Sequence, residues 1–280
     1  MNVPIVAETV FHIGSFPVTN AYINSTILTI GFVVFALFMK FTMKKVPGKV
    51  QNFFEAVLEF LFSYFDRVTG NREASKRFLP IVGTLFLFIL LSNWMGLLPG
   101  MGTIGVWHVE NGTKTLVPFF RSAGSDLNLT LAMALIAVIS SHLIGMFTLG
   151  FFVHWNKFIQ VGSVWKAIKT FSPMKILVAL IEFLVGFIEL FSEAAKVVSL
   201  SLRLFGNIFA GEVLMTVLSS LFAYILPIPF MGMELIVGIV QATVFSMLTL
   251  VYLSIMTTKP HGGDADVHEI HEEMPVHAHA

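Results

Sequence analysis

The chain has 280 residues, of which 56% are hydrophobic and only 12% are charged, whereas soluble domains carry about 25% charged residues. Lysine plus arginine and aspartate plus glutamate each number 17, so the charge balance gives no sign of a nucleic-acid partner. Cysteine is absent, which excludes disulfides, thiol chemistry and cysteine-based metal sites. We predict an all-α membrane protein in which residues 1–257 form one polytopic domain.

The first apolar stretch, residues 24–43, is predicted to cross the membrane. Residues 1–23 contain no lysine or arginine, so a cleaved signal peptide with a basic start is not expected. Residues 50–66 place apolar side chains at helical spacing, with acids elsewhere on the helix. This pattern is typical of an amphipathic helix that lies at the membrane interface.

Two further spans are predicted over residues 78–98 and 126–153, joined by a loop at 100–125. The loop matches the pattern GxGxxG from Gly100 to Gly105, but it follows a membrane helix and no βαβ unit surrounds it. A dinucleotide site is therefore rejected. Residues 154–172 contain tryptophan and lysine, and we expect another interfacial segment there.

The longest predicted helix covers residues 173–226. A Ser-Pro pair at 172–173 is a helix start signal, and no proline follows until Pro227. At 1.5 Å per residue this helix would be about 80 Å long, against an apolar slab of roughly 30 Å. It must therefore tilt steeply. A short turn at Pro227 leads to the last span, 230–257, which we expect to pair with the long helix.

The distribution of basic residues predicts the orientation, because cytoplasmic loops are enriched in lysine and arginine. Basic residues cluster in 40–77 and 157–175, whereas residues 1–23 have none. Five crossings therefore place the N-terminus outside and the tail, 258–280, in the cytoplasm. The tail is acidic and His-rich and is predicted to be disordered. Its histidine spacing is not HExxH, so no metal site is predicted.

Polar residues form a stripe on the long helix. At about 100° per residue they fall within an arc of roughly 80°. The stripe consists of Glu182, Glu189, Glu193, Lys196, Arg203 and Asn207. Ionisable groups at membrane depth are costly unless paired or hydrated, so the stripe indicates a water path or a charged partner. The alternative is a structural Glu–Lys ladder, for example between Glu193 and Lys196.

Further polar residues lie toward the outer side. Glu212 points away from the stripe, while Glu234 and Gln241 share one face of the last helix. The predicted topology places Arg203 between these residues and the cytoplasmic acids. Two alternatives stay open: Glu212 pairs with a cation elsewhere in the chain, and Gln241 makes only an interhelical hydrogen bond.

Several stretches resemble a known family. The run Ser201-Leu-Arg203-Leu-Phe-Gly-Asn207-Ile-Phe-Ala-Gly-Glu212 is similar to the signature of subunit a of the F-type ATP synthase, the stator of the membrane motor. Residues 93–100, 126–132 and 241–245 agree with the same family. Val197 stands where many members have proline, which favours an unbroken helix.

The resemblance implies a role for each matching position. Arg203 would face the ring of c subunits. The outer half-channel would be lined by Asn207, Glu212, Glu234 and Gln241, although some members have histidine at Glu234. Glu189 would lie on the cytoplasmic exit side. Glu182 and Glu193, from their depth on the helix, are assigned to the same cytoplasmic half-channel.

The resemblance further implies a proton-translocating, non-catalytic subunit with no cofactor and no metal. Its partners would be the c-subunit ring, the b subunits, the remaining ATP synthase complex and membrane lipid, with one copy per complex in the bacterial inner membrane. The proton is the default ion, and Na⁺ stays open because the ion-binding carboxylate would lie on the c subunit.

Two other classes of protein were weighed. A self-sufficient proton- or cation-coupled secondary transporter would typically show inverted repeats and broken helices, and neither is evident. An intramembrane hydrolase would need a nucleophile or metal motif, and the chain has no cysteine, HExxH or GxSxG.

Overall fold

The computed structural model describes residues 9–98, 104–110, 113–119, 121–156, 158, 173–221 and 227–258. The helices are α1 (Asn20–Thr42), α2 (Lys49–Thr69), α3 (Arg72–Leu97), α4 (Leu127–Leu149), α5 (Phe151–Trp155), α7 (Pro173–Leu221) and α8 (Pro227–Thr257), with a 3-10 turn, η2, at Ala123–Ser125. The predicted helical class and the pairing of the long helix with the last helix are confirmed.

The helix starts follow local capping chemistry. Thr19 and Asn71 cap α1 and α3, each accepting a hydrogen bond from a backbone N–H in the first turn. Asp126 caps α4 by accepting from the backbone N–H of Asn128 at 3.0 Å. The predicted span 126–153 is shorter in the structure, because Gly150 at φ 91° ends α4 and redirects the chain into α5.

The last helix begins earlier than predicted. We expected a turn at residues 227–229, but α8 starts at Pro227, since proline needs no N–H partner in the first helical turn. The long helix begins at Pro173 as predicted and continues without a break to Leu221. Its predicted last residues, 222–226, lie outside the described residues, as do 159–172 and the tail from 259.

Two antiparallel hairpins were not predicted. β1 (Thr9–Ile13) pairs with β2 (Phe16–Thr19), and β3 (Gly105–Glu110) pairs with β4 (Thr113–Pro118). The first turn contains Gly14 at φ 64°, a left-handed conformation that suits glycine. The sequence between β3 and β4 is Asn-Gly, a strong hairpin signal that the helical interpretation overlooked.

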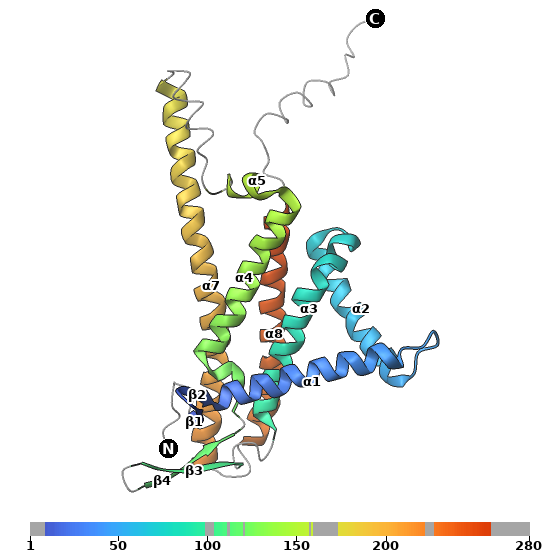
Figure 1. The fold of residues 1–280 in the computed structure, drawn as a ribbon, viewed down its shortest axis with the longest axis vertical. Coiled ribbons are helices and arrows are strands. Elements are labelled where there is room, and N and C mark those ends of the chain that lie inside the picture. Colours follow the sequence, from blue (N-terminus) through green and yellow to red (C-terminus); the bar gives the residue numbers. More distant parts are fainter. Residues whose placement is uncertain are drawn as a thin grey trace, which may run out of the picture.

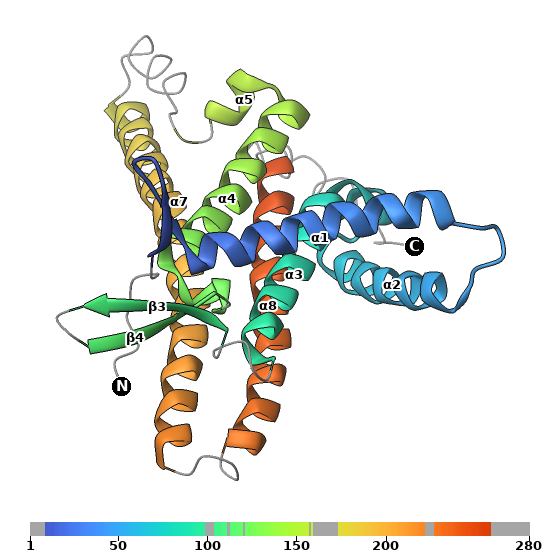
Figure 2. The same cartoon turned by 60° about the horizontal axis from the view of Figure 1, so that its bottom comes forward.

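The helices pack around one apolar core. α7 lies beside α4 and α8, and α3 packs along α8, while α1 runs across the others in both views (Figures 1 and 2). The core is formed by α2, α3, α4, α7 and α8, and its fully buried members include Phe65, Val82, Ala134, Leu204 and Leu250. Both hairpins lie near the end of the molecule where α7 meets α8 (Figure 1).

Four described helices are long and apolar enough to cross a membrane: α1, α3, α4 and α8. Most apolar side chains of α1 are exposed, as expected of a helix that contacts lipid. The fifth crossing, by α7, stays a prediction. Its 49 residues would extend about 74 Å at 1.5 Å per residue, more than twice the apolar thickness of a bilayer.

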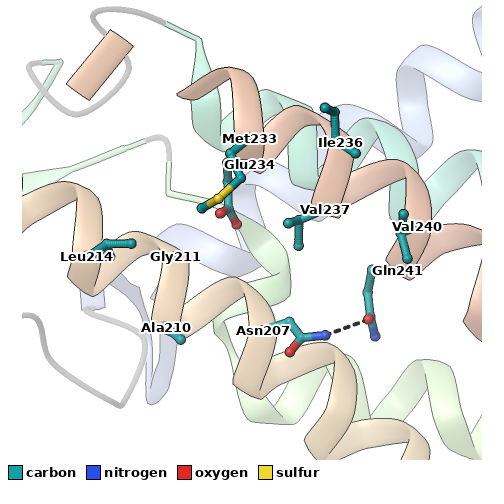
Figure 3. Close-up of a pocket in the computed structure, with 10 residues that line it drawn as sticks. All are labelled: Asn207, Ala210, Gly211, Leu214, Met233, Glu234, Ile236, Val237, Val240 and Gln241. Atoms are coloured by element: carbon teal, nitrogen blue, oxygen red, sulfur yellow. Dashed lines mark hydrogen bonds between the residues drawn. The ribbon is translucent and has the colours of Figure 1, made fainter. Parts of the chain in front are cut away.

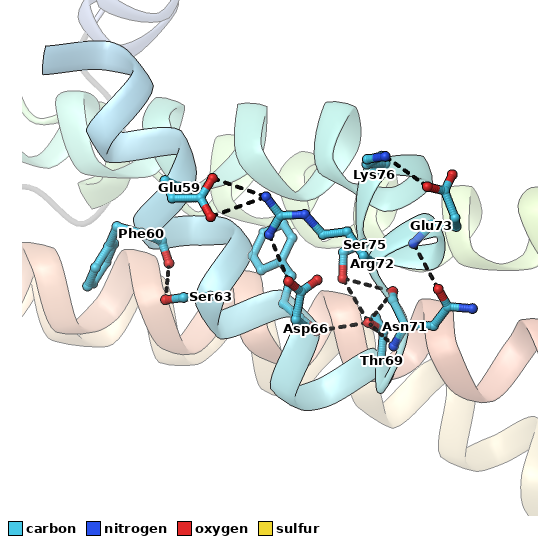
Figure 4. A network of polar contacts seen from close by, with 11 residues as sticks. Glu59, Phe60, Ser63, Asp66, Thr69, Asn71, Arg72, Glu73, Ser75 and Lys76 are labelled. Carbon is cyan, nitrogen blue, oxygen red and sulfur yellow. Dashed lines mark hydrogen bonds and ion pairs between the residues drawn. The ribbon is translucent and has the colours of Figure 1, made fainter. Parts of the chain in front are cut away.

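The corner between α2 and α3 is held by ion pairs (Figure 4). Arg72 donates to Asp66 at 2.7 Å and to Glu59 at 3.0 Å, and its guanidinium lies 3.9 Å from the centre of the Phe62 ring. Hydrogen bonding by Ser75 and by Arg72 lowers the pKa of the Asp66 carboxyl. α2 is the predicted amphipathic helix, and this corner fixes it against α3.

Candidate functional site

A cavity of about 480 Å³ opens between α7 and α8. Figure 3 shows that its polar lining comes from both helices: Asn207 from α7, and Glu234 and Gln241 from α8. The remaining lining is mostly apolar. Three residues predicted for the outer half-channel thus meet at one cavity, which we call the outer pocket.

The two amides of the outer pocket are joined across the helix pair. Asn207 Nδ2 donates to Gln241 Oε1 at 2.7 Å. Gln241 is 3% exposed, and its Nε2 has no hydrogen-bond partner among the described residues. Gln241 therefore makes the interhelical hydrogen bond that the alternative interpretation expected. It also lines the outer pocket.

Glu234 depends on a glycine of the facing helix. It is 8% exposed, and a Cβ added at Gly211 would overlap its carboxylate. Gly211 thus lets α7 approach α8 closely enough for the carboxylate to fit between them. Within the described part of the chain no ion pair includes Glu234, and such a buried carboxylate is suited to binding and releasing a proton.

Glu212 has a cationic partner. Arg121 Nε donates to Glu212 Oε1 at 2.7 Å, and the side chains are 5% and 27% exposed. Arg121 lies just before η2 and is tied to α1, because Asn24 Nδ2 donates to its carbonyl oxygen. The alternative that Glu212 pairs with an unseen cation is the one observed, and Glu212 does not line the outer pocket.

Arg203 lies on an exposed face of α7. None of the ion pairs found within the described part of the chain includes it. Gly206 and Asn207, on the same side, are also exposed. The guanidinium is therefore accessible to a group outside this chain and is not neutralised by an acid of the described residues.

Acids on the other side of Arg203 are packed differently. Glu193 accepts from Lys196 at 2.5 Å, so the predicted Glu–Lys ladder exists at this step. Its other oxygen lies 3.4 Å from His142 Nε2, and His142 Nδ1 lies 3.2 Å from His154 Nε2. These four residues from α4, α5 and α7 form what we call the inner cluster.

Glu182 and Glu189 lie further toward the amino end of α7. Both are partly exposed, and none of the ion pairs among the described residues includes them. The stripe predicted on one face of α7 is thus divided. Glu193 is buried toward α4, whereas Arg203 is exposed.

Sequence reasoning missed Arg121, His142 and His154. His142 gave the clearest available signal, because an ionisable residue inside a predicted apolar span points to a functional or paired position. The sequence signal from Arg121 and His154 was weaker, because both lie at span ends, where charged residues are common. Among the described residues there is no cluster of acids and histidines that would hold a metal ion.

Comparison with known proteins identifies the family to which the chain belongs. The family model described as ATP synthase A chain matches residues 22–254. The "ATP synthase subunit a, sodium ion specific" of Propionigenium modestum is 32% identical over 256 residues, which covers 89% of this chain and 78% of that protein. ATP synthase subunit a of Mycobacterium bovis is 35% identical over 225 residues, 79% of each chain. That of Moorella thermoacetica is 29% identical over 245 residues, 88% and 94% of the two chains.

Proposed function

As a member of the ATP synthase A chain family, the chain is a non-catalytic, ion-translocating membrane subunit of the ATP synthase, and we propose that it moves protons through two offset half-channels separated by Arg203. The outer half-channel includes Asn207, Glu234 and Gln241. The cytoplasmic half-channel includes Glu182, Glu189 and Glu193.

The observation that carries this proposal is the position of Arg203 along α7. Lys196 of the inner cluster lies seven residues before it and Asn207 of the outer pocket lies four residues after it, distances of about 10 and 6 Å along the helix. The two polar sites are thus separated by a short segment of α7 whose buried face carries Leu200 and Leu204, with the Ser201 hydroxyl between them facing that of Thr130. The exposed face of that segment presents the guanidinium.

Arginine suits the gate for a physical reason. Its guanidinium remains protonated at all ordinary pH values. It favours the ionised form of a carboxylate brought close to it, so a rotor carboxyl releases its proton there. It also repels protons and other cations, which keeps the two half-channels from joining. A lysine would serve poorly, because a desolvated ammonium can lose its proton.

Glu212 takes a different role from the one first expected. Arg121 binds one of its oxygens, so this carboxylate is engaged in a fixed ion pair. We place it at the mouth of the outer half-channel, where a fixed charge pair orders the segment before η2 against α7. Proton binding inside that half-channel then falls to Glu234.

The exposed face around Arg203, Gly206 and Asn207 is the contact surface that we assign to the c-subunit ring. A Cβ added at Gly206 would meet nothing within 4 Å, so the surface is flat and open there. The b subunits and the remaining complex complete the assembly. In the proposed orientation the N-terminus lies outside and the C-terminus lies in the cytoplasm of a bacterial cell.

The transported ion needs its own test, because one relative is named as sodium ion specific. The complete ATP synthase in liposomes should synthesise ATP when driven by a pH gradient without Na⁺. Synthesis that requires a Na⁺ gradient would contradict the proton assignment. A self-sufficient transporter would instead catalyse uptake when this chain is reconstituted alone.

The gate is tested by replacing Arg203 in the complete enzyme. Arg203→Ala should abolish proton-driven ATP synthesis while ATP hydrolysis by the soluble sector continues, and Arg203→Lys should restore little of it. His12→Gln, on the exposed part of β1, is the control and should retain full synthesis. An Arg203→Ala enzyme that still couples would refute the assignment.

A further inference from the structure

His142 lies between a buried carboxylate and the surface of the chain. Its side chain is 26% exposed, whereas that of Glu193 is 7% exposed. Its Nε2 lies 3.4 Å from Glu193 Oε2, and its Nδ1 lies 3.2 Å from His154 Nε2. The imidazole therefore has one nitrogen toward the acid and the other toward a second imidazole.

The Glu193 carboxylate is held on one side only. Oε1 accepts from Lys196, while Oε2 is buried and accepts no hydrogen bond within the described part of the chain. The Lys196 ammonium binds Oε1, and the His142 imidazole lies 3.4 Å from Oε2. Oε2 is therefore the position where this carboxylate can bind a proton. A buried oxygen that accepts no hydrogen bond lowers the stability of the fold, and a role in binding a proton gives a reason for this arrangement.

We propose that His142 accepts the proton from Glu193 and releases it toward the cytoplasmic side. The inference rests on the proposed cytoplasmic half-channel and adds a proton-carrying residue to it. The Glu193 O–H bond breaks as an N–H bond forms at His142 Nε2. The proton on Nδ1 leaves to water at the exposed part of the His142 ring, and no electrons are transferred. Imidazole suits this step because it gains and loses protons between pH 5 and 8.

His154 is a positioning residue in this arrangement. It is 1% exposed, and its ring centre lies 5.4 Å from that of His142 and 5.7 Å from that of Phe158. A Cβ added at Gly145 would come within 2.9 Å of the His154 ring, so α4 and α5 hold this imidazole tightly. Its contact with Nδ1 fixes the orientation of His142 toward the acid.

The ionisable groups around His142 come from α5 and α7, and an aromatic ring of α8 packs behind them. α5 contributes His154, and α7 contributes Glu193 and, behind it, Lys196. α8 contributes Tyr252, whose ring centre lies 4.9 Å from Lys196 Nζ. A positive charge that arrives on His142 is balanced by Glu193, whereas Lys196 keeps the carboxylate from rebinding the proton too firmly.

The test uses the complete ATP synthase in liposomes, with proton pumping and ATP synthesis measured across about pH 5.5 to 8.5. His142→Gln should lower both rates by about tenfold or more, and the remaining rate should lose its dependence on imidazole protonation. His12→Gln makes the same chemical change outside the inner cluster and should leave rate and pH profile unchanged. Full rates with an unaltered profile in His142→Gln would overturn the proposal.

Chemical rescue separates proton transfer from a structural role. Imidazole added to an assembled His142→Ala enzyme should restore a measurable part of the pumping rate, and it should not restore His154→Ala. Loss of pumping in His142→Ala without rescue would assign His142 a structural role only and overturn the proposal. If Arg203→Ala uncouples the enzyme and His142→Gln does not, the half-channel account survives and only this inference fails.

Discussion

The outer pocket and the inner cluster both bring polar side chains together against α7, but they are built differently. The outer pocket is an open cavity between α7 and α8, lined by the Asn207–Gln241 hydrogen bond and by the Glu234 carboxylate. The inner cluster is closed: carboxylate, ammonium and imidazoles lie in direct contact, with Phe158 packed against both histidine rings. The difference teaches that one helix can line an open polar cavity on one side of Arg203 and a closely packed cluster of charged side chains on the other.

The most severe test of the outer pocket is to fill the space left by a glycine. Gly211→Ala places a methyl group where the Glu234 carboxylate lies, so this flexible side chain must move. We expect proton-driven ATP synthesis to fall by about tenfold or more, since displacements near 1 Å can cost that much, while assembly is retained. Synthesis rates in liposomes measure this effect.

The matched control is Gly232→Ala on α8, where an added Cβ meets nothing within 4 Å. It should leave the rate unchanged. Normal synthesis in Gly211→Ala would show that the position of Glu234 is not critical, and the outer pocket would lose its assigned role.

The ion pair beside the outer pocket separates stability from transport. Glu212→Gln leaves the buried Arg121 guanidinium without its carboxylate, which should destabilise the chain by about 3 kcal/mol. The double change Arg121→Met with Glu212→Met should recover most of this loss, because apolar replacements of a buried pair are often neutral. Thermal unfolding in detergent measures both.

If the single and double variants lose equal stability, the pair is not a coupled unit. If the double variant is stable and transports protons at the normal rate, Glu212 acts only in structure and the mouth of the half-channel lies elsewhere.

The smallest effect is expected at the α2–α3 corner, which serves as a reference away from both sites. Because the pKa of Asp66 lies below its ordinary value of 3.8 in the folded chain, its ionised form contributes stability above that value. This contribution is lost as the pH falls through the folded pKa. Asp66→Asn should therefore be less stable than the natural chain at pH 7, and the two should converge below about pH 4.

Glu73→Gln, which removes only the exposed pair with Lys76, should change the melting temperature little at either pH. A constant difference between Asp66→Asn and the natural chain from pH 7 to about pH 3 would contradict the assignment of the lowered pKa.

Much of the fold could be predicted because it follows from hydropathy and capping. The apolar runs gave α1, α3, α4 and α8, and the absence of proline gave the continuous α7. Helix ends were less predictable where a single residue decides them. Pro227 was taken for a turn although it begins α8, and Gly150 ends α4 earlier than the apolar run does.

The site was predicted in part, for reasons that differ between its two ends. Helical spacing placed Glu234 and Gln241 on one face, and the structure finds both at the outer pocket. Lys196 was predicted as a partner of Glu193 from helical spacing. The contacts of Glu193 with His142 and of Glu212 with Arg121 could not be predicted, because these residues are distant in sequence and meet only through the packing of α4 and η2 against α7.

The central claim is that Arg203 keeps the two half-channels apart, and passive proton permeability tests it most directly. Liposomes containing the membrane sector with Arg203→Ala should leak protons faster than those with the natural chain under the same applied voltage. His12→Gln should match the natural chain. A permeability of Arg203→Ala equal to that of the natural chain would contradict the account, because the outer pocket and the inner cluster would then be separated by something other than this guanidinium.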